Sequence, residues 1–196
     1  MKNKLIARAC CALLLAECLL VILSWLLSAT RLEGVRSLLS SEGVRWFVGT
    51  YSDMIASPLL AWLLLAMVSL GCLQTCGIFA AVKTFKSYRD RIALRVSLVF
   101  LFIYLGEICL LTLMPHAILL SVTGSLFPSA FSRSLVPIVT FGICLFSVSY
   151  GIMSGRTRSL TAILESLSYG VEKGAPLLVL YIFLMQFVAS LRFVFG

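Results

Sequence analysis

Five long apolar runs, separated by short polar segments, constrain this chain more than any other feature of its sequence. A helix needs roughly 20 apolar residues to cross the hydrocarbon core of a bilayer. The chain has 196 residues, of which 61% are hydrophobic and 12% charged, so the five runs and their connections use nearly all of it. The sequence therefore predicts a single all-α polytopic membrane domain over residues 1–196, with no soluble catalytic or nucleic-acid-binding domain.

The predicted elements follow the order of these runs. We expect five transmembrane helices, over residues 9–29, 58–82, 92–114, 135–154 and 176–195. Two further stretches, 37–52 and 159–175, mix charged residues with apolar residues at helical spacing, which is typical of amphipathic helices that lie in the membrane interface. A serine oxygen can accept a hydrogen bond from the unpaired N–H groups of a first turn, so the fragment Ser40-Ser41-Glu42-Gly43 is expected to give the first of them its start. Residues 116–134 are predicted to form an external loop.

Basic residues are distributed unevenly over the ends of these helices. The first run follows basic residues, as in a signal peptide, but its length and its poor cleavage site, Leu27-Ser28-Ala29, favour a retained helix. With the N-terminus inside, 11 of the 16 Lys and Arg residues are cytoplasmic: Lys2, Lys4, Arg8, Lys83, Lys86, Arg89, Arg91, Arg95, Arg156, Arg158 and Lys173. Positive charge is retained on the cytoplasmic side, so the pattern predicts an internal N-terminus and an external C-terminus. The net charge of +8 therefore indicates membrane orientation and not nucleic-acid binding.

The chain contains one internal repetition. Arg36-Ser37-Leu38 followed by Pro58-Leu59-Leu60 is repeated, in the same order, as Arg158-Ser159-Leu160 followed by Pro176-Leu177-Leu178. An odd number of spans separates the two copies, so they would face opposite sides of the membrane, as in the inverted-topology repeats of secondary transporters. Leu and Ser are abundant here, and a chance match is the alternative.

Four polar side chains fall inside the predicted spans: Glu17, Gln74, Glu107 and Gln186. An ionised carboxylate in hydrocarbon costs several kcal/mol, so each glutamate is expected to be protonated, paired or placed at a protein interface. Proton or cation handling is one interpretation. The other is hydrogen bonding between helices or subunits, with Gln74 or Gln186 as a partner. We take these four residues as the candidate intramembrane polar contacts.

No sequence pattern indicates catalysis, a metal centre or a bound cofactor. His116 is the single histidine, and no pattern of Ser, Cys or carboxylate surrounds it. The seven cysteines lie within or at the start of apolar stretches, without the polar loops of disulfide scaffolds or zinc sites. Cys72 and Cys76 are one helical turn apart, but no histidine or second cysteine pair accompanies them. We expect neither an enzyme nor a cofactor.

Two parts of the sequence resemble a known transporter family. Residues 35–47 (VRSLLSSEGVRWF) resemble the signature that follows the first helix of the AbgT family, the aminobenzoyl-glutamate transporters. Residues 149–152 (SYGI), with the basic turn after them, and residues 186–189 (QFVA) resemble a later region of that family, in the same order. The two matches cover most of the chain, and the resemblance implies a multi-pass protein of the bacterial inner membrane.

The chain departs from this family where transport takes place. The resemblance implies two re-entrant hairpins, with adjoining broken helices, that hold substrate and coupling ion. The short connection at residues 83–91 stands where the first hairpin block would be inserted, and the sequence stops at Gly196, before the second. Asp53-Met54 replaces the family's Asn-Phe, and Gln74 replaces an acidic residue. The retained part corresponds to the inner, dimer-forming scaffold.

These departures favour a transporter-derived integral membrane scaffold without a complete transport site. Solute sites in secondary transporters are usually built where helices break and expose backbone groups, and the five runs contain no internal Pro-Gly break of that sort. The expected partner is a second copy of the chain or another membrane subunit. Two alternatives stay open: a small secondary transporter or exporter of anionic aromatic or amino-acid-like solutes, and one subunit of a split transporter.

Overall fold

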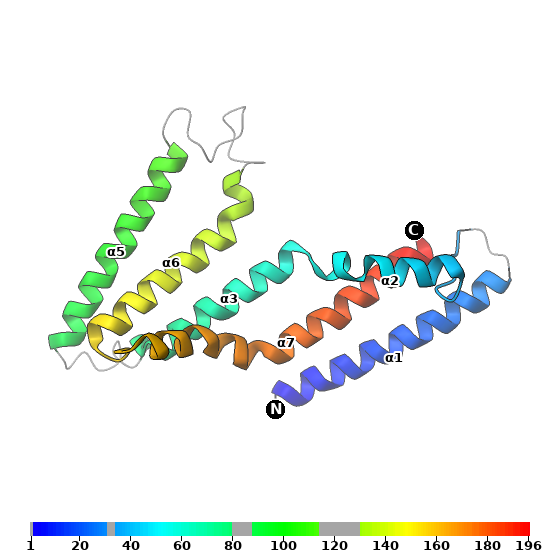
Figure 1. The fold of residues 1–196 in the computed structure, drawn as a ribbon, viewed down its shortest axis with the longest axis horizontal. Helices are drawn as coiled ribbons and strands as arrows, with labels where there is room; N and C mark the ends of the chain where they lie inside the picture. Colours follow the sequence, from blue (N-terminus) through cyan, green and yellow to red (C-terminus); the bar gives the residue numbers. More distant parts are fainter. Residues whose placement is uncertain (1, 31–33, 80–87, 114–129) are drawn as a thin grey trace. The chain divides into compact units, whose positions relative to one another are not determined.

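The computed structural model describes residues 2–30, 34–79, 88–113 and 130–196 (Figure 1). The described part of the chain is helical, with no strand, and its main elements are α1 (Lys2–Ala29), α2 (Ser41–Ile55), α3 (Pro58–Thr75), α5 (Tyr88–Leu113), α6 (Ala130–Ser154) and α7 (Leu160–Phe195). Five of these helices, all except α2, are long and apolar enough to cross a membrane. For the residues that the structure describes, the predictions of a helical chain and of five helices apolar enough to cross a membrane are confirmed.

The chain divides into two compact units. Unit 1 consists of Met1–Ala61 together with Gly174–Gly196, and therefore combines both ends of the chain. Unit 2 consists of Trp62–Lys173. The helices α3 and α7 contribute residues to both units.

Unit 1 is held together by apolar packing and by hydrogen bonds to the segment before α2. Its buried cluster consists of Leu20, Leu38, Phe193 and Val194. Trp46 of α2 stacks on Phe193, with ring centroids 4.3 Å apart. The Leu38 N–H donates to Ser24 Oγ at 3.2 Å, and the Arg36 N–H donates to the Val194 carbonyl at 3.1 Å. These contacts fasten the segment before α2 to both α1 and α7.

Unit 2 has a core of its own, formed by the residues just after α3 with α5 and α6. Its buried cluster consists of Cys76, Ile78, Ala93 and Tyr150. The helices α5 and α6 run side by side (Figure 1). The first turns of α7 pack on α3 where Gly71 meets Gly170, since a Cβ on either glycine would overlap the backbone of the other helix.

Several helix boundaries differ from the predicted ones for local reasons. α1 begins seven residues before residue 9, because the residues from Lys2 onward continue the helical pattern. The structure places the cap within the predicted start fragment, at Ser40, whose Oγ accepts from the Gly43 N–H at 3.0 Å. The helix therefore starts at Ser41 and not at residue 37. α3 ends at Thr75 and not at residue 82, because Gly77 turns the chain with a φ of 76°, a conformation that glycine adopts at helix ends.

The helix α7 is one element where the sequence predicts two. An interfacial helix over 159–175 and a separate span from residue 176 are expected, but the helix runs without interruption from Leu160 to Phe195, with Pro176 inside it. A proline removes one backbone hydrogen bond and strains the preceding turn, but it does not end a helix whose remaining residues favour it. Ser159 begins the helix, with its Oγ accepting from the Ala162 N–H at 3.1 Å.

The predicted external loop is also shorter than expected. α6 begins at Ala130 and contains Pro137, so residues 130–134 are helical and do not belong to the loop. The rest of that predicted loop, including His116, lies outside the described residues. Lys83 and Lys86 of the basic connection lie outside them as well.

The two copies of the repeated motifs have different local structures. In the first copy, α2 ends at Ile55 and α3 begins at Pro58. In the second copy, the corresponding proline, Pro176, lies within the continuous helix α7. The same order of motifs therefore gives two helices in one copy and a single helix in the other, and the inverted relation of the copies stays a prediction.

Candidate intramembrane polar site

A buried polar cluster joins α1 to α7 within unit 1. Ser190 Oγ donates a hydrogen bond to Glu17 Oε1 at 2.5 Å and accepts one from Gln186 Nε2 at 3.2 Å. Gln186 and Ser190 are four residues apart, so they share one face of α7. Ser190 is fully buried, and Gln186 is 9% exposed. The structure thus brings together two of the four residues that the sequence singled out, through a serine that it did not.

The two hydrogen bonds of this cluster fix the orientation of the Gln186 amide. A serine hydroxyl carries one hydrogen, and Ser190 gives it to Glu17. Gln186 must therefore present its NH₂ group to Ser190, which leaves the Gln186 carbonyl facing elsewhere. Glu17 Oε2 and Gln186 Oε1 are both buried, and neither accepts a hydrogen bond within the described chain. The cluster therefore holds two acceptors that lack donors.

A cavity of about 240 Å³ lies in unit 1, and Glu17 and Gln186 are among the residues that line it. It is lined by residues of α1, α2 and α7: Leu13, Leu14, Glu17, Phe47, Tyr51, Ile182, Phe183 and Gln186. Glu17 and Phe47 also line a second cavity of about 200 Å³, which extends toward Val21 and Leu38. The lining is mostly apolar, and the two unpaired oxygen atoms are themselves buried away from water. We call the larger space the Glu17 cavity.

The other two predicted contacts lie on exposed helix faces. Gln74 is exposed near the end of α3, and Glu107 is exposed on α5. Neither has a hydrogen-bond or ion-pair partner among the described residues. The structure therefore connects neither of them with the cluster at Glu17.

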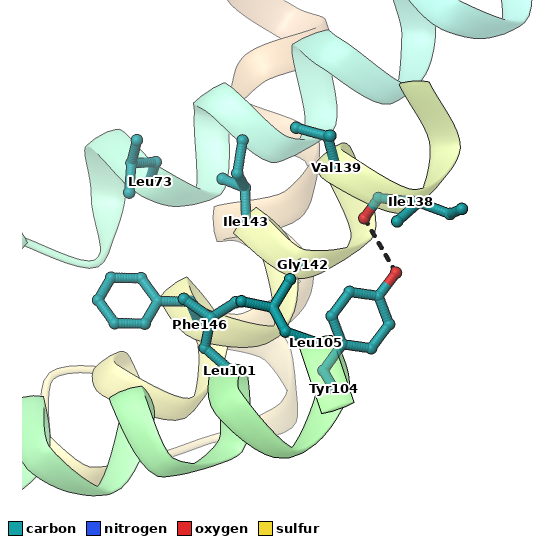
Figure 2. A pocket seen from close by; sticks show the side chains of 9 residues that line it. All are labelled: Leu73, Leu101, Tyr104, Leu105, Ile138, Val139, Gly142, Ile143 and Phe146. Carbon is teal, nitrogen blue, oxygen red and sulfur yellow. Dashed lines mark hydrogen bonds between the residues drawn. The ribbon is translucent and has the colours of Figure 1, made fainter. Parts of the chain in front are cut away.

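A second, apolar pocket of about 310 Å³ lies in unit 2 (Figure 2). It is lined by Leu73, Leu101, Tyr104, Leu105, Ile138, Val139, Gly142, Ile143 and Phe146. Its one polar side chain is already used, because the Tyr104 hydroxyl donates to the Ile138 carbonyl at 2.9 Å. Gly142 lets the Tyr104 ring approach α6, since a Cβ there would lie 3.1 Å from the ring. The described lining is apolar enough for an acyl chain, but it leaves no polar side chain free to bind a polar group of a ligand.

The residue types that hold metal ions in other proteins do not come together in the part of this chain that the structure describes. No group of three His, Cys, Asp or Glu side chains that could hold a metal ion occurs among the residues that the structure describes. All seven cysteines are free thiols. Comparisons of the chain with family models, with curated proteins and with solved structures found no match. The resemblance to the AbgT family therefore rests on the sequence motifs alone.

Proposed function

We propose that this chain is an integral membrane scaffold, related to the inner core of AbgT-type transporters, that assembles with a second copy of itself through α5. The proposal rests on one observation: Glu107 lies on the exposed surface of a helix that is apolar enough to cross the membrane. A carboxyl group that faces lipid is costly even on the lenient insertion scales. A protein partner on this face removes that cost.

The surroundings of Glu107 suit a contact between helices. Ile103 and Leu110 lie one turn to either side of it and are 54% and 58% exposed. Leu111 and Phe100 extend the same side of α5 and are exposed too. We call these five residues the Glu107 face. In a two-fold dimer this face meets itself, so the two Glu107 side chains can hydrogen-bond across the interface.

The continuity of the helices supports a scaffold over a complete transporter. Each of the five membrane-crossing helices is a single element throughout its described length, including α6 and α7, which contain Pro137 and Pro176. Among the described residues, none of these five helices is interrupted between its two ends, and α3 itself stops at Thr75, where Gly77 turns the chain. A transport site of the usual kind needs such an interruption.

A photo-crosslinking experiment tests this proposal. A photoreactive amino acid is placed at Leu110, on the Glu107 face, and at Phe102 as a matched control. Phe102 is also exposed on α5, but it lies on another side of the helix. We expect a covalent dimer from position 110 and little from position 102. Glu107→Leu is expected to weaken dimerisation roughly threefold to tenfold, whereas Glu107→Gln, which can still hydrogen-bond, retains most of it.

Other outcomes decide between the remaining functions. A solubilised chain that stays monomeric and gives no crosslink from position 110 contradicts the scaffold proposal. A crosslink from position 110 to a different polypeptide replaces the second copy by another membrane subunit, as in a split transporter. Saturable uptake of an anionic aromatic solute into reconstituted vesicles, lost in Glu107→Gln, favours the transporter alternative.

A further inference from the structure

We propose that unit 2 binds the head group of an anionic phospholipid at a cluster of three exposed arginines. These are Arg89 at the start of α5, and Arg156 and Arg158 in the turn between α6 and α7. We call them the arginine cluster. The inference does not depend on the proposed function, because the Glu107 face lies further along α5, from Phe100 to Leu111.

Two glycine turns bring these arginines together. Gly77 follows α3 and Gly155 follows α6, with φ angles of 76° and 74°. Arg156 Nη1 donates to the Gly77 carbonyl at 2.6 Å, and Arg158 Nε donates to the Gly155 carbonyl at 3.0 Å. The Arg89 guanidinium lies over Gly155, since a Cβ at that glycine would overlap it. The ends of α3, α5 and α6 therefore meet under three guanidinium groups.

The charge at this end of unit 2 is not balanced by carboxylates. In the sequence, residues 77–95 and 150–164 contain seven basic residues and one acidic residue, Asp90. Asp90 is half-buried and interacts electrostatically with Tyr150. None of the three arginines forms an ion pair within the described chain. Like charges that lie close together repel each other, so an anion bound among them is favoured.

The type of cation indicates a phosphate. A guanidinium carries five N–H donors in a planar fork, which matches two oxygen atoms of a phosphate at once. Arg156 and Arg158 each give one N–H to a carbonyl, and Arg89 gives none within the described chain. All three side chains are exposed, so a ligand can reach the remaining donors.

The neighbouring surface indicates that the phosphate belongs to a lipid. The arginines lie at the ends of helices that are apolar enough to cross a membrane, and such helix ends lie at the depth of the lipid head groups. Leu160, two residues after Arg158, is 85% exposed, and Leu164, one turn further along α7, is 67% exposed. This apolar surface beside the cluster favours an amphiphile over a free phosphate ion. Basic pockets between membrane helices bind anionic head groups in this way.

Native mass spectrometry of the full-length protein tests the proposal. The protein is released from a neutral detergent that contains equal amounts of phosphatidylglycerol and phosphatidylcholine with the same acyl chains. We expect phosphatidylglycerol to be the preferred bound lipid. Arg89→Gln, which removes a charge without removing a hydrogen bond of the described chain, should lower the affinity for phosphatidylglycerol about fivefold. The double variant Arg89→Gln/Arg158→Gln should lower it about thirtyfold.

A matched double variant separates the cluster from net charge. Lys4→Gln/Arg8→Gln also removes two positive charges, at exposed positions near the start of α1, and should bind phosphatidylglycerol like the wild type. Helical circular dichroism and thermal unfolding establish folding, and if the Arg89/Arg158 double variant does not fold, Arg89→Gln decides. Equal binding of the two lipids, or an equal loss in both double variants, would overturn the proposal. So would displacement of the lipid by inorganic phosphate at the same concentration, because the site would then take a free phosphate.

Discussion

At the scale of single residues, Tyr181 shows how buried hydroxyl groups hold unit 1 together. Its hydroxyl donates to the Ile55 carbonyl at 3.0 Å and lies 2.6 Å from Ser57 Oγ. A phenol has one hydrogen, so Ser57 must be the donor in the second contact. One side chain of α7 thereby satisfies the end of α2 and the residue before α3.

The variant Tyr181→Phe tests how much these hydrogen bonds contribute to stability. The variant keeps the ring but removes the hydroxyl that donates to the Ile55 carbonyl and accepts from Ser57 Oγ. Because the Ile55 carbonyl still accepts from the Ser57 N–H, we expect the free energy of unfolding to fall by about 1 kcal/mol. Thermal unfolding in detergent measures the change. Tyr88→Phe is the control, because Tyr88 is 79% exposed and should have almost no effect. Equal midpoints for the two variants would show that the Tyr181 hydroxyl contributes nothing.

The sequence reveals some of these residues and hides others. Glu17 and Gln186 attract attention because polar groups are costly in an apolar run. Ser190 and Tyr181 do not, because serine and tyrosine are common in such runs and no local cost marks them. Their roles depend on which helices meet, as does the cavity at Phe47 and Tyr51. The spacing of four residues between Gln186 and Ser190 was the one available signal.

At the scale of elements, the contact between α3 and α7 depends on two glycines that face each other. A methyl group on Gly71 would overlap the backbone of Gly170, and one on Gly170 would overlap the Met67 carbonyl. Neither obstacle is a flexible side-chain end that can move aside. Small residues allow helices to approach in this way inside membranes, where close packing replaces the hydrophobic effect as the force between them.

Gly71→Ala should therefore destabilise unit 2. Alanine favours helices over glycine by about 1 kcal/mol, but the overlap outweighs this, and we expect a net loss of about 1–3 kcal/mol. Gly106→Ala provides the matched control, since nothing lies within 4 Å of a Cβ at that position of α5. The control should be neutral or slightly stabilising. Thermal unfolding of both variants gives the comparison, and a stabilised Gly71→Ala would contradict the close approach.

The presence of the helices could be predicted from the sequence more reliably than the residues at which they begin and end. The apolar runs identify five helices because length and hydropathy are local properties. The continuity of α7 through Pro176 could not be read from the pattern, since a proline fits both the first turn of a new helix and the interior of a long one. The end of α3 depends on a glycine conformation, which the sequence permits but does not require.

At the scale of the whole molecule, orientation follows from the distribution of charge. Eleven of the 16 basic residues fall on one side of the predicted topology, which predicts a cytoplasmic N-terminus and, if all five apolar helices cross, an external C-terminus. We expect alkaline phosphatase to be active when fused after Gly196 and inactive when fused at Thr157, between α6 and α7. A green fluorescent protein fused at the same positions should give the opposite result. Fusions with the reverse pattern would exclude the predicted orientation.

Unit 1 contains both ends of the chain, so its parts are synthesised at different times. Its first part, Met1–Ala61, leaves the ribosome well before Gly174–Gly196, whereas the residues of unit 2 are continuous in the chain. Domains usually fold as units and in the order in which they emerge. Here the unit that is begun first is completed last, because Glu17 and the Arg36 N–H find their partners, Ser190 and the Val194 carbonyl, only in the final helix. Until then, α1 depends on lipid or on the insertion machinery for its neighbours.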